Sequence, residues 1–155
     1  MTPAINLAKQ HKIVYQIHQY QHAPNAVSYG LEAADKLGCN ASQVYKTLIA
    51  ELDKNQLVVA VLPVNKQLNL KLLAKAAGAK KAEMAKPDAA QRATGYLLGG
   101  VSPLGQKKRL KSYICQTAQQ HQTLFVSAGK RGLEIELQPQ DLQQLTLAKF
   151  ARLTD

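Results

Sequence analysis

The sequence predicts a fold of the α+β class, in which helices and short strands are interspersed along the chain. Two kinds of local pattern indicate it. Short helix patterns begin at cap residues and end at glycines, and pairs of apolar, β-branched runs are separated by short turns. Because strands pair locally rather than alternating regularly with helices, a mixed domain is favoured over a βαβ array. At 155 residues the chain suits one hydrophobic core, and we expect a single domain over residues 1–155.

The first elements are predicted from caps and alternation. Thr2 followed by proline is typical of a helix start, which predicts a helix over residues 3–10. Apolar and polar residues then alternate over residues 13–18, which predicts a strand. Ser28 can cap a second helix, and Gly38 ends it.

The middle and end of the chain follow the same logic. Residues 44–50 and 57–62 are apolar runs around a polar turn, which predicts a hairpin. Asn69 caps a helix that Gly78 ends. The remaining predicted elements are a strand at 82–84, a helix from Pro87 to Gly95, a hairpin of 124–127 with 133–137, and a helix from Pro139.

The charge balance indicates a polyanionic partner. The chain has 20 Lys and Arg against 10 Asp and Glu, a net charge of +10 and a pI near 9.7. Such a charge favours phosphate-rich ligands but does not separate DNA, RNA, nucleotide or anionic lipid. A basic, solvated surface without a polyanionic partner is the open alternative.

Targeting and redox patterns indicate a cytoplasmic protein without a membrane partner. The N-terminal residues lack the apolar run of a signal peptide, and no run approaches the ~20 apolar residues that span a bilayer. Cys39 and Cys115 are too few for a disulfide framework, so we expect both to be reduced.

The common catalytic motifs do not match. Residues 100–105 read G-x-S-x-x-G, one residue longer than a nucleophile elbow, and Pro103 disfavours the helix that must follow. Neither a P-loop nor a dinucleotide motif occurs, and the four histidines show no metal-ligand spacing. We therefore predict no cofactor and no metal.

Glycines and cations remain as candidate site residues. Gly99 and Gly100, and a second loop at Gly129 and Gly132, allow backbone N–H groups to approach an anion or an oxyanion closely. The alternative is that these glycines only form turns. Lys46 lies in an apolar strand, where its charge suits phosphate if the strand borders a concave face.

Taken in order along the chain, these segments resemble the YbaK family of free-standing editing proteins, relatives of the editing domain inserted in bacterial prolyl-tRNA synthetases. The longest matching stretch is Gly99-Gly100-Val101-Ser102-Pro103-Leu104-Gly105, continued by Gln106-Lys107-Lys108-Arg109. The other matching stretches are 1–4, 44–48, 79–81, 90–92, 94–97, 126–127 and 129–133.

The resemblance implies a mixed sheet curled into a barrel-like core with surrounding helices, and deacylation of Cys-tRNA(Pro), with Cys-tRNA(Cys) as a further substrate. It implies a catalytic group of Lys46, Gly99, Gly100 and Val101, with Lys46 holding the tRNA 3′ end. Implied substrate-binding residues are Tyr20, Tyr29, Thr47, Ser102, Ser127 and Gly129. Implied tRNA-binding residues are Lys107, Lys108, Arg109, Lys130 and Arg131. The roles of Glu134 and Glu136 stay unassigned.

The family resemblance also implies a mechanism without a protein nucleophile, in which the thiol of the substrate cysteine attacks its own ester. No RNA-reading module with stacking aromatics is recognisable, so a bound prolyl-tRNA synthetase is a candidate source of tRNA selectivity. Three alternatives stay open: an editing domain that removes alanine from Ala-tRNA(Pro) with water, a non-catalytic tRNA-binding module, and a basic domain with no nucleic-acid role.

Overall fold

The computed structural model describes residues 1–24 and 28–155. Its helices are α1 (Pro3–Gln10), α2 (Tyr29–Leu37), α3 (Leu70–Ala77), α4 (Pro87–Thr94) and α5 (Pro139–Thr146), with short 3-10 helices η1 (Ala41–Gln43) and η2 (Gln116–Gln120). Its strands are β1 (Tyr15–Gln19), β2 (Tyr45–Leu52), β3 (Gln56–Pro63), β4 (Ala82–Met84), β5 (Lys111–Cys115), β6 (Leu124–Lys130), β7 (Leu133–Leu137) and β8 (Lys149–Ala151).

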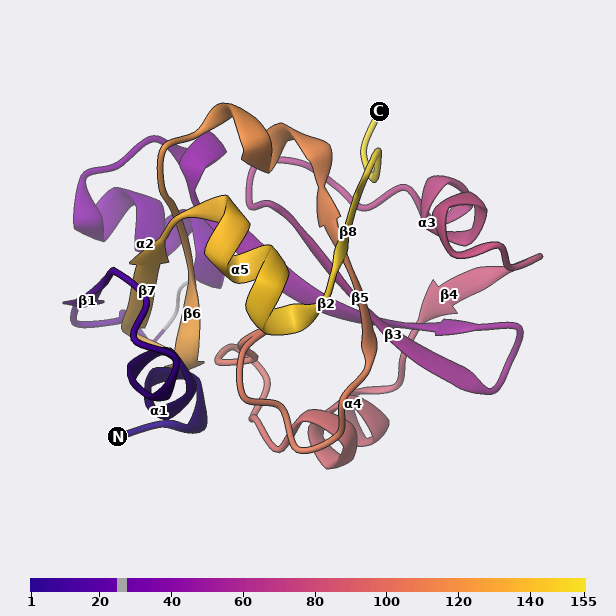
Figure 1. The fold of residues 1–155 in the computed structure, drawn as a ribbon, viewed down its shortest axis with the longest axis horizontal. Helices are drawn as coiled ribbons and strands as arrows, with labels where there is room; N and C mark the ends of the chain where they lie inside the picture. The colour runs from indigo at the N-terminus through magenta and orange to yellow at the C-terminus, as the bar shows by residue number, and fades with distance from the viewer. Residues whose placement is uncertain (25–27) are drawn as a thin grey trace.

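The strands form two sheets that lie side by side (Figure 1). The smaller sheet has the order β1-β7-β6 and is antiparallel throughout. The larger sheet has the order β4-β2-β3-β5-β8, in which β5 and β8 run parallel to their neighbours and the other pairs are antiparallel. The α+β class and the mixed sheet are therefore confirmed.

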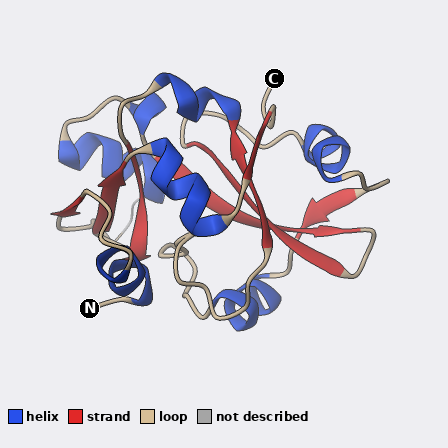
Figure 2. Ribbon diagram, viewed as in Figure 1, coloured by secondary structure: helices blue, strands red, loops and turns tan. Residues whose placement is uncertain are grey.

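The predicted barrel-like core is wrong. Closure would require ladder hydrogen bonds to continue around a ring of strands. Within the described chain the two sheets are joined only by an isolated parallel bridge between Val44 and Phe125. Each sheet consequently keeps its own edge strands, as the red arrows of Figure 2 show.

The local signals for helices and hairpins are confirmed. The side chains of Thr2, Ser28 and Asn69 each accept a hydrogen bond from a backbone N–H of the first helical turn. Gly38 and Gly78 end α2 and α3 in the left-handed conformation, as expected of helix C-caps. The hairpins β2–β3 and β6–β7 pair in antiparallel register.

Two strands of the larger sheet are absent from the sequence prediction. β5 lies inside the larger sheet between parallel neighbours and is buried at four of its five positions, so it shows no polar alternation. β8 has only three residues. The predicted first strand is present but begins at Tyr15. Its Ile17 is exposed, whereas His18 is half-buried.

The buried side chains form two clusters that hold the two sheets and the helices together. The larger cluster includes the inner positions of both sheets and residues of α1 and α5. The smaller cluster consists of Ala33 and Ala34 of α2 with Val44, Val64 and Phe125. It fixes α2 over the place where the two sheets meet. No helix in residues 1–24 and 28–155 has both the length and the apolar character needed to cross a bilayer.

Gly105 offers a test of the packing between α1 and the loop before β5. Its φ is +68°, and a Cβ would lie 2.6 Å from the carbonyl oxygen of Pro3. Gly78 has a similar φ of +70°, but no atom lies within 4 Å of its Cβ position. We expect Gly105→Ala to lower the free energy of unfolding by about 1–3 kcal/mol more than Gly78→Ala, because only Gly105→Ala adds overpacking to backbone strain.

Urea denaturation of the two variants measures this difference. Equal losses in the two variants would contradict the packing shown for Gly105.

Candidate functional site

A cavity of about 290 Å³ opens beside the start of β2, where the two sheets meet. Its walls come from β2, from the smaller sheet, from the start of α2 and from the loop before residue 101. The lining residues are Tyr20, Ser28, Tyr29, Gly30, Tyr45, Lys46, Thr47, Leu48, Leu98, Gly99, Val101, Ser127 and Glu134. Seven predicted site residues from five separate segments therefore meet here: Tyr20, Tyr29, Lys46, Thr47, Gly99, Val101 and Ser127.

β2 carries the cation of the cavity. Lys46 is half-buried on this strand, and desolvation by the surrounding protein lowers the pKa of its ammonium. None of the three ion pairs found in the described chain involves Lys46. The neighbouring Thr47 has a buried Oγ1 without a hydrogen-bond partner among the described residues. Lys46 thus offers a charge to a ligand, while the Thr47 hydroxyl is enclosed by the protein.

One wall of the cavity is built around the ring of Tyr29. The guanidinium carbon of Arg131 lies 4.2 Å from the ring centroid, a cation–π contact. On Gly99, whose φ is +89°, an added Cβ would lie 2.9 Å from Tyr29 Cε2. A side chain at position 99 would therefore displace this aromatic wall.

Gly100 joins two loops and does not line the cavity. Its N–H donates to Leu97 O at 3.0 Å, so this N–H is already engaged in a turn. An added Cβ would lie 2.9 Å from Lys130 Cα. Gly100 thus lets the loop of residues 97–101 pack directly on the turn between β6 and β7. The N–H groups of Gly99 and Val101 have no hydrogen-bond partner in the described chain.

Of the other predicted substrate-binding residues, one lines the cavity and two lie outside it. Ser102 is fully buried, its Oγ accepts from Leu104 N, and it does not line the cavity. Ser127 lines the cavity, and its Oγ accepts from Gly129 N at 3.1 Å. Gly129 itself has a φ of +106° and packs against Tyr96, outside the lining.

The predicted tRNA-binding cations fall in two places, neither inside the cavity. The backbone N–H groups of Lys107 and Lys108 donate to carbonyls at the end of α4. Lys108 and Arg109 line a separate cavity of about 150 Å³. Lys130 and Arg131 border an open groove of about 800 Å³, which shares Tyr20 with the site.

Glu134 belongs to the cavity, although the sequence assigned it no role. It is 6% exposed, and burial raises the pKa of its carboxyl to about 8. Tyr20 beside it has a pKa raised to about 12, first by burial and then by the charge of Glu134. In sequence, Glu134 alternates with apolar residues, the pattern of a solvent-exposed position. Only the packing of the smaller sheet buries it.

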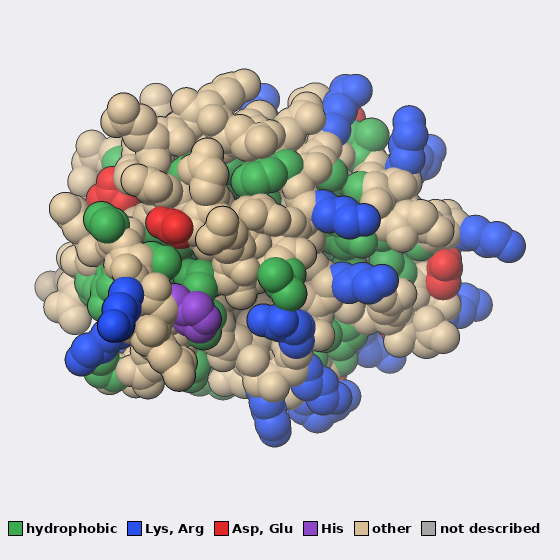
Figure 3. All heavy atoms as spheres, in the orientation of Figure 1, with side chains coloured by type: hydrophobic (Ala, Val, Ile, Leu, Met, Phe, Trp, Pro, Cys, Tyr) green, Lys and Arg blue, Asp and Glu red, His purple; other side chains and the backbone are tan. Residues whose placement is uncertain are grey.

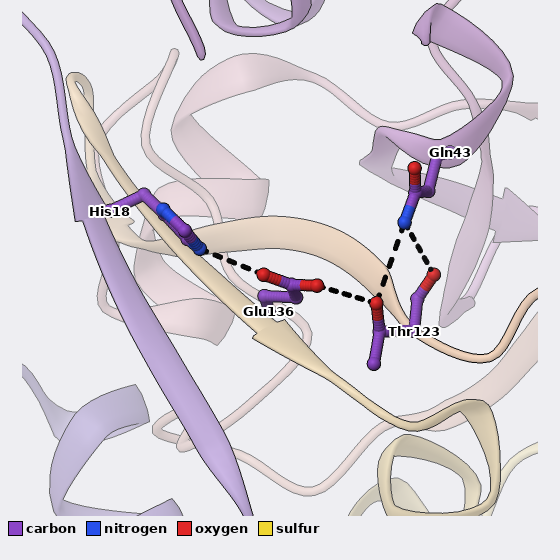
Figure 4. Close-up of polar contacts among 4 residues, drawn as sticks. All are labelled: His18, Gln43, Thr123 and Glu136. Atoms are coloured by element: carbon purple, nitrogen blue, oxygen red, sulfur yellow. Dashed lines mark hydrogen bonds and ion pairs between the residues drawn. The ribbon is translucent and has the colours of Figure 1, made fainter. Parts of the chain in front are cut away.

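Glu136 lies two residues further along the same strand face. Its carboxylate has hydrogen-bond partners, as Figure 4 shows. Its carboxylate pairs with His18 Nε2 at 2.9 Å and accepts from Thr123 Oγ1 at 2.5 Å. Gln43 Nε2 donates to Thr123 O at 3.0 Å, which continues the network to η1. The contrast marks Glu134 as the carboxyl group available to a ligand.

Among residues 1–24 and 28–155, no three side chains of His, Cys, Asp or Glu come together in a way that could hold a metal ion.

Sequence comparison identifies the family. The profile of the aminoacyl-tRNA editing domain matches residues 23–145. An Enterococcus faecalis protein, EbsC, named as a candidate Cys-tRNA(Pro)/Cys-tRNA(Cys) deacylase, is 40% identical over 99% of this chain and 93% of its own length. The chain belongs to the aminoacyl-tRNA editing domain family. An uncharacterised Bacillus subtilis protein, YwhH, is 28% identical over 76% of this chain and 74% of its own length.

Solved structures share the fold of this editing domain. The hypothetical protein APE2540 superposes with a TM-score of 0.88 at 23% identity, over 99% of this chain and 100% of that one. A candidate trans-editing enzyme for prolyl-tRNA synthetase superposes with a TM-score of 0.83 at 20% identity, over 100% and 99%. The predicted editing-family membership is thus confirmed, and the architecture is that of whole structures of similar length.

The buried Glu134 makes the stability of this editing domain depend on pH. Between pH 5 and 8 the folded chain holds a proton at Glu134 that the unfolded chain releases. The stability that this bound proton contributes is therefore lost as pH rises through about 8. We expect Glu134→Gln to gain stability relative to the wild type over this range, because glutamine carries no charge to desolvate.

Urea unfolding at several pH values compares the two proteins. Parallel stability profiles for wild type and variant between pH 5 and 8 would contradict the protonated, buried carboxyl.

Proposed function

We propose that this editing domain is a trans-acting deacylase that removes cysteine from mischarged Cys-tRNA(Pro) and also accepts Cys-tRNA(Cys). The observation that carries the proposal is the cavity at Lys46, whose lining brings an unpaired lysine together with Gly99 and Val101, the N–H groups of which have no partner in the described chain. This donor set suits a phosphate next to an ester carbonyl. The name of EbsC supports cysteine as the amino acid.

The reaction we propose uses the thiol of the substrate. Its sulfur bonds to the ester carbonyl carbon, the bond from that carbon to the 3′ oxygen of the tRNA breaks, and the thiol proton passes to the departing oxygen. Water then opens the resulting thiolactone and frees cysteine. Among the described residues the cavity lining has serine and threonine hydroxyls but no histidine or cysteine, and the assignment of the nucleophile to the substrate follows the resemblance to the YbaK family.

In this proposal the protein acts by positioning and by electrostatics. Lys46 binds the terminal phosphate, and the N–H groups of Gly99 and Val101 stabilise the oxyanion. Gly100 holds their loop in place, since its own N–H is engaged. Holding thiol and carbonyl together contributes ~7 kcal/mol or more to lowering the barrier, and a preorganised oxyanion donor contributes ~3 kcal/mol.

The side walls of the cavity give the amino-acid pocket its shape. Tyr20 and Tyr29 bound the space for the cysteine side chain, with Ser127 and Thr47 as hydroxyl partners. Glu134, uncharged near neutral pH, presents a carboxyl that can donate a hydrogen bond to the substrate.

A small pocket discriminates weakly between similar amino acids. Near-isosteric side chains differ by only ~1–3 kcal/mol in binding, so the thiol itself is the selective element. Recognition of tRNA(Pro) is then left to a second protein, and a prolyl-tRNA synthetase bound in the cytoplasm is the partner we propose.

Replacing the cation tests the assignment directly. We expect Lys46→Ala to lower kcat/KM for release of labelled cysteine from Cys-tRNA(Pro) about 10- to 100-fold, since a charge-assisted contact worth ~1.5–3 kcal/mol is lost. Lys149→Ala removes an exposed lysine of β8 that does not line the cavity and serves as the matched control.

Serine and alanine esters, which have no thiol, separate thiol chemistry from attack by water. The proposal expects release of cysteine but not of serine or alanine from the same tRNA. Equal release of alanine would replace substrate-assisted cleavage by hydrolysis. An ester left intact by the wild type, with and without prolyl-tRNA synthetase, would overturn the deacylase and make a non-catalytic tRNA-binding module the leading alternative.

A further inference from the structure

The positive charge of this protein is concentrated in the middle of the chain. Residues 46–111 hold 13 of the 20 Lys and Arg side chains but only 4 of the 10 Asp and Glu side chains. Apart from Lys46, all of these cations are exposed. In Figure 3 the blue side chains gather over the half of the visible face where Figure 1 places α3, β4 and α4.

Part of this charge converges on the β2–β3 turn, at the end of β2 opposite to the cavity. The Asp53 carboxylate accepts hydrogen bonds from the N–H groups of Lys80 and Lys81, at 3.1 and 2.9 Å. Asp53 N in turn donates to Lys81 O at 2.9 Å. These bonds hold Lys80 and Lys81 against the turn that carries Lys54.

Helix α3 adds two further lysines next to β4. It packs on β4, the edge strand that begins directly after Lys81, and its Lys71 and Lys75 are exposed one turn apart. We call Lys54, Lys71, Lys75, Lys80 and Lys81 the distal lysine cluster.

The distal lysine cluster is not neutralised within the protein. The three ion pairs of the described chain involve His18, Arg92 and Arg131, and none involves a lysine. Three carboxylates lie near these lysines in sequence: Asp53, which accepts two backbone N–H groups, and Glu51 and Glu83, which face each other across β2 and β4. None of the three forms an ion pair with a lysine in the described chain. Five exposed cations against three carboxylates leave a net positive charge that attracts a polyanion.

Lys54 also occupies a position that lysine does not favour. Asp53 and Lys54 have φ values of +49° and +71°, and Asn55 N donates to Leu52 O, as in the hairpin turn that prefers asparagine and glycine. A lysine here costs roughly 1 kcal/mol against glycine. The turn thus carries a charge at a cost in stability.

We propose that the distal lysine cluster is a second RNA-binding site, which holds phosphates of the tRNA body while the esterified 3′ end lies at Lys46. The six residue-to-residue steps from Lys46 to Leu52 span ~20 Å of extended strand. A single nucleotide cannot bridge that distance, whereas the paired stem that precedes the 3′ end of a tRNA can. This inference rests on the proposed deacylase function and adds the surface that supplies affinity.

The test compares two triple variants that each remove three positive charges. The cluster variant is Lys54→Asn, Lys80→Gln and Lys81→Gln. The control variant is Lys9→Gln, Lys12→Asn and Lys36→Gln, whose lysines are exposed and lie outside the cluster. Lys12 has a φ of +56°, so each variant replaces one lysine whose backbone is in the left-handed region and relieves the same kind of backbone strain.

Uncharged tRNA(Pro) is the probe, and its affinity is measured against salt concentration. We expect the slope of log K against log salt concentration to be smaller in magnitude by about three in the cluster variant, which is about one per lost phosphate contact. The control variant is expected to keep the wild-type slope. Lys54→Asn alone is expected to raise stability to urea while it weakens tRNA binding, so lost binding cannot be attributed to misfolding.

Three outcomes would overturn the inference: an unchanged slope in the cluster variant, an equal loss in the control, or binding of anionic lipid vesicles in preference to tRNA. A cysteine ester of adenosine 5′-monophosphate, which keeps the terminal phosphate but has no tRNA body, separates this inference from the proposed function. The cluster variant is expected to cleave that small ester at the wild-type rate. An ester that the wild type leaves intact would count against the proposed function and not against the cluster.

Discussion

The packing of α2 over the meeting line of the two sheets is the constraint on which the rest of the site depends. Val44 is fully buried there and bridges to Phe125, while Ala33 and Ala34 cover both. The chain leaves this cluster directly into Lys46 on one side and into Ser127 on the other. Because a close-packed apolar contact has little freedom to adjust, it sets the separation between the cation and the opposite wall of the cavity.

Burial and charge oppose each other inside this cavity. Desolvation lowers the pKa of Lys46 and raises that of Glu134, so each group is pushed toward its neutral form. Glu136, by contrast, has partners for its carboxylate in His18 and Thr123. Under the proposed function, a phosphate and a developing oxyanion meet the donors of this cavity in a low-dielectric site, where electrostatic interactions are stronger than in water.

Under the two proposals, chemistry and affinity are separated along β2. The cavity at one end of the strand is small and largely apolar, and in the proposed function its few polar groups select what is cleaved. The exposed lysines at the other end have no partners in the described chain and attract phosphate at longer range. Such a division explains how a small domain without an RNA-reading module can hold a large substrate and act on a single ester.

The sequence by itself determined the features that depend on neighbours a few residues apart. Caps at Thr2, Ser28 and Asn69 and the two hairpins were predictable because their hydrogen bonds are local, and the resemblance of separate short segments identified the family. Tertiary structure alone decided that the sheets stay open, that Gly100 packs against Lys130, and that Glu134 is buried. Those outcomes arise from contacts between segments far apart in the chain, and neither a periodicity nor a spacing records which face another segment will cover.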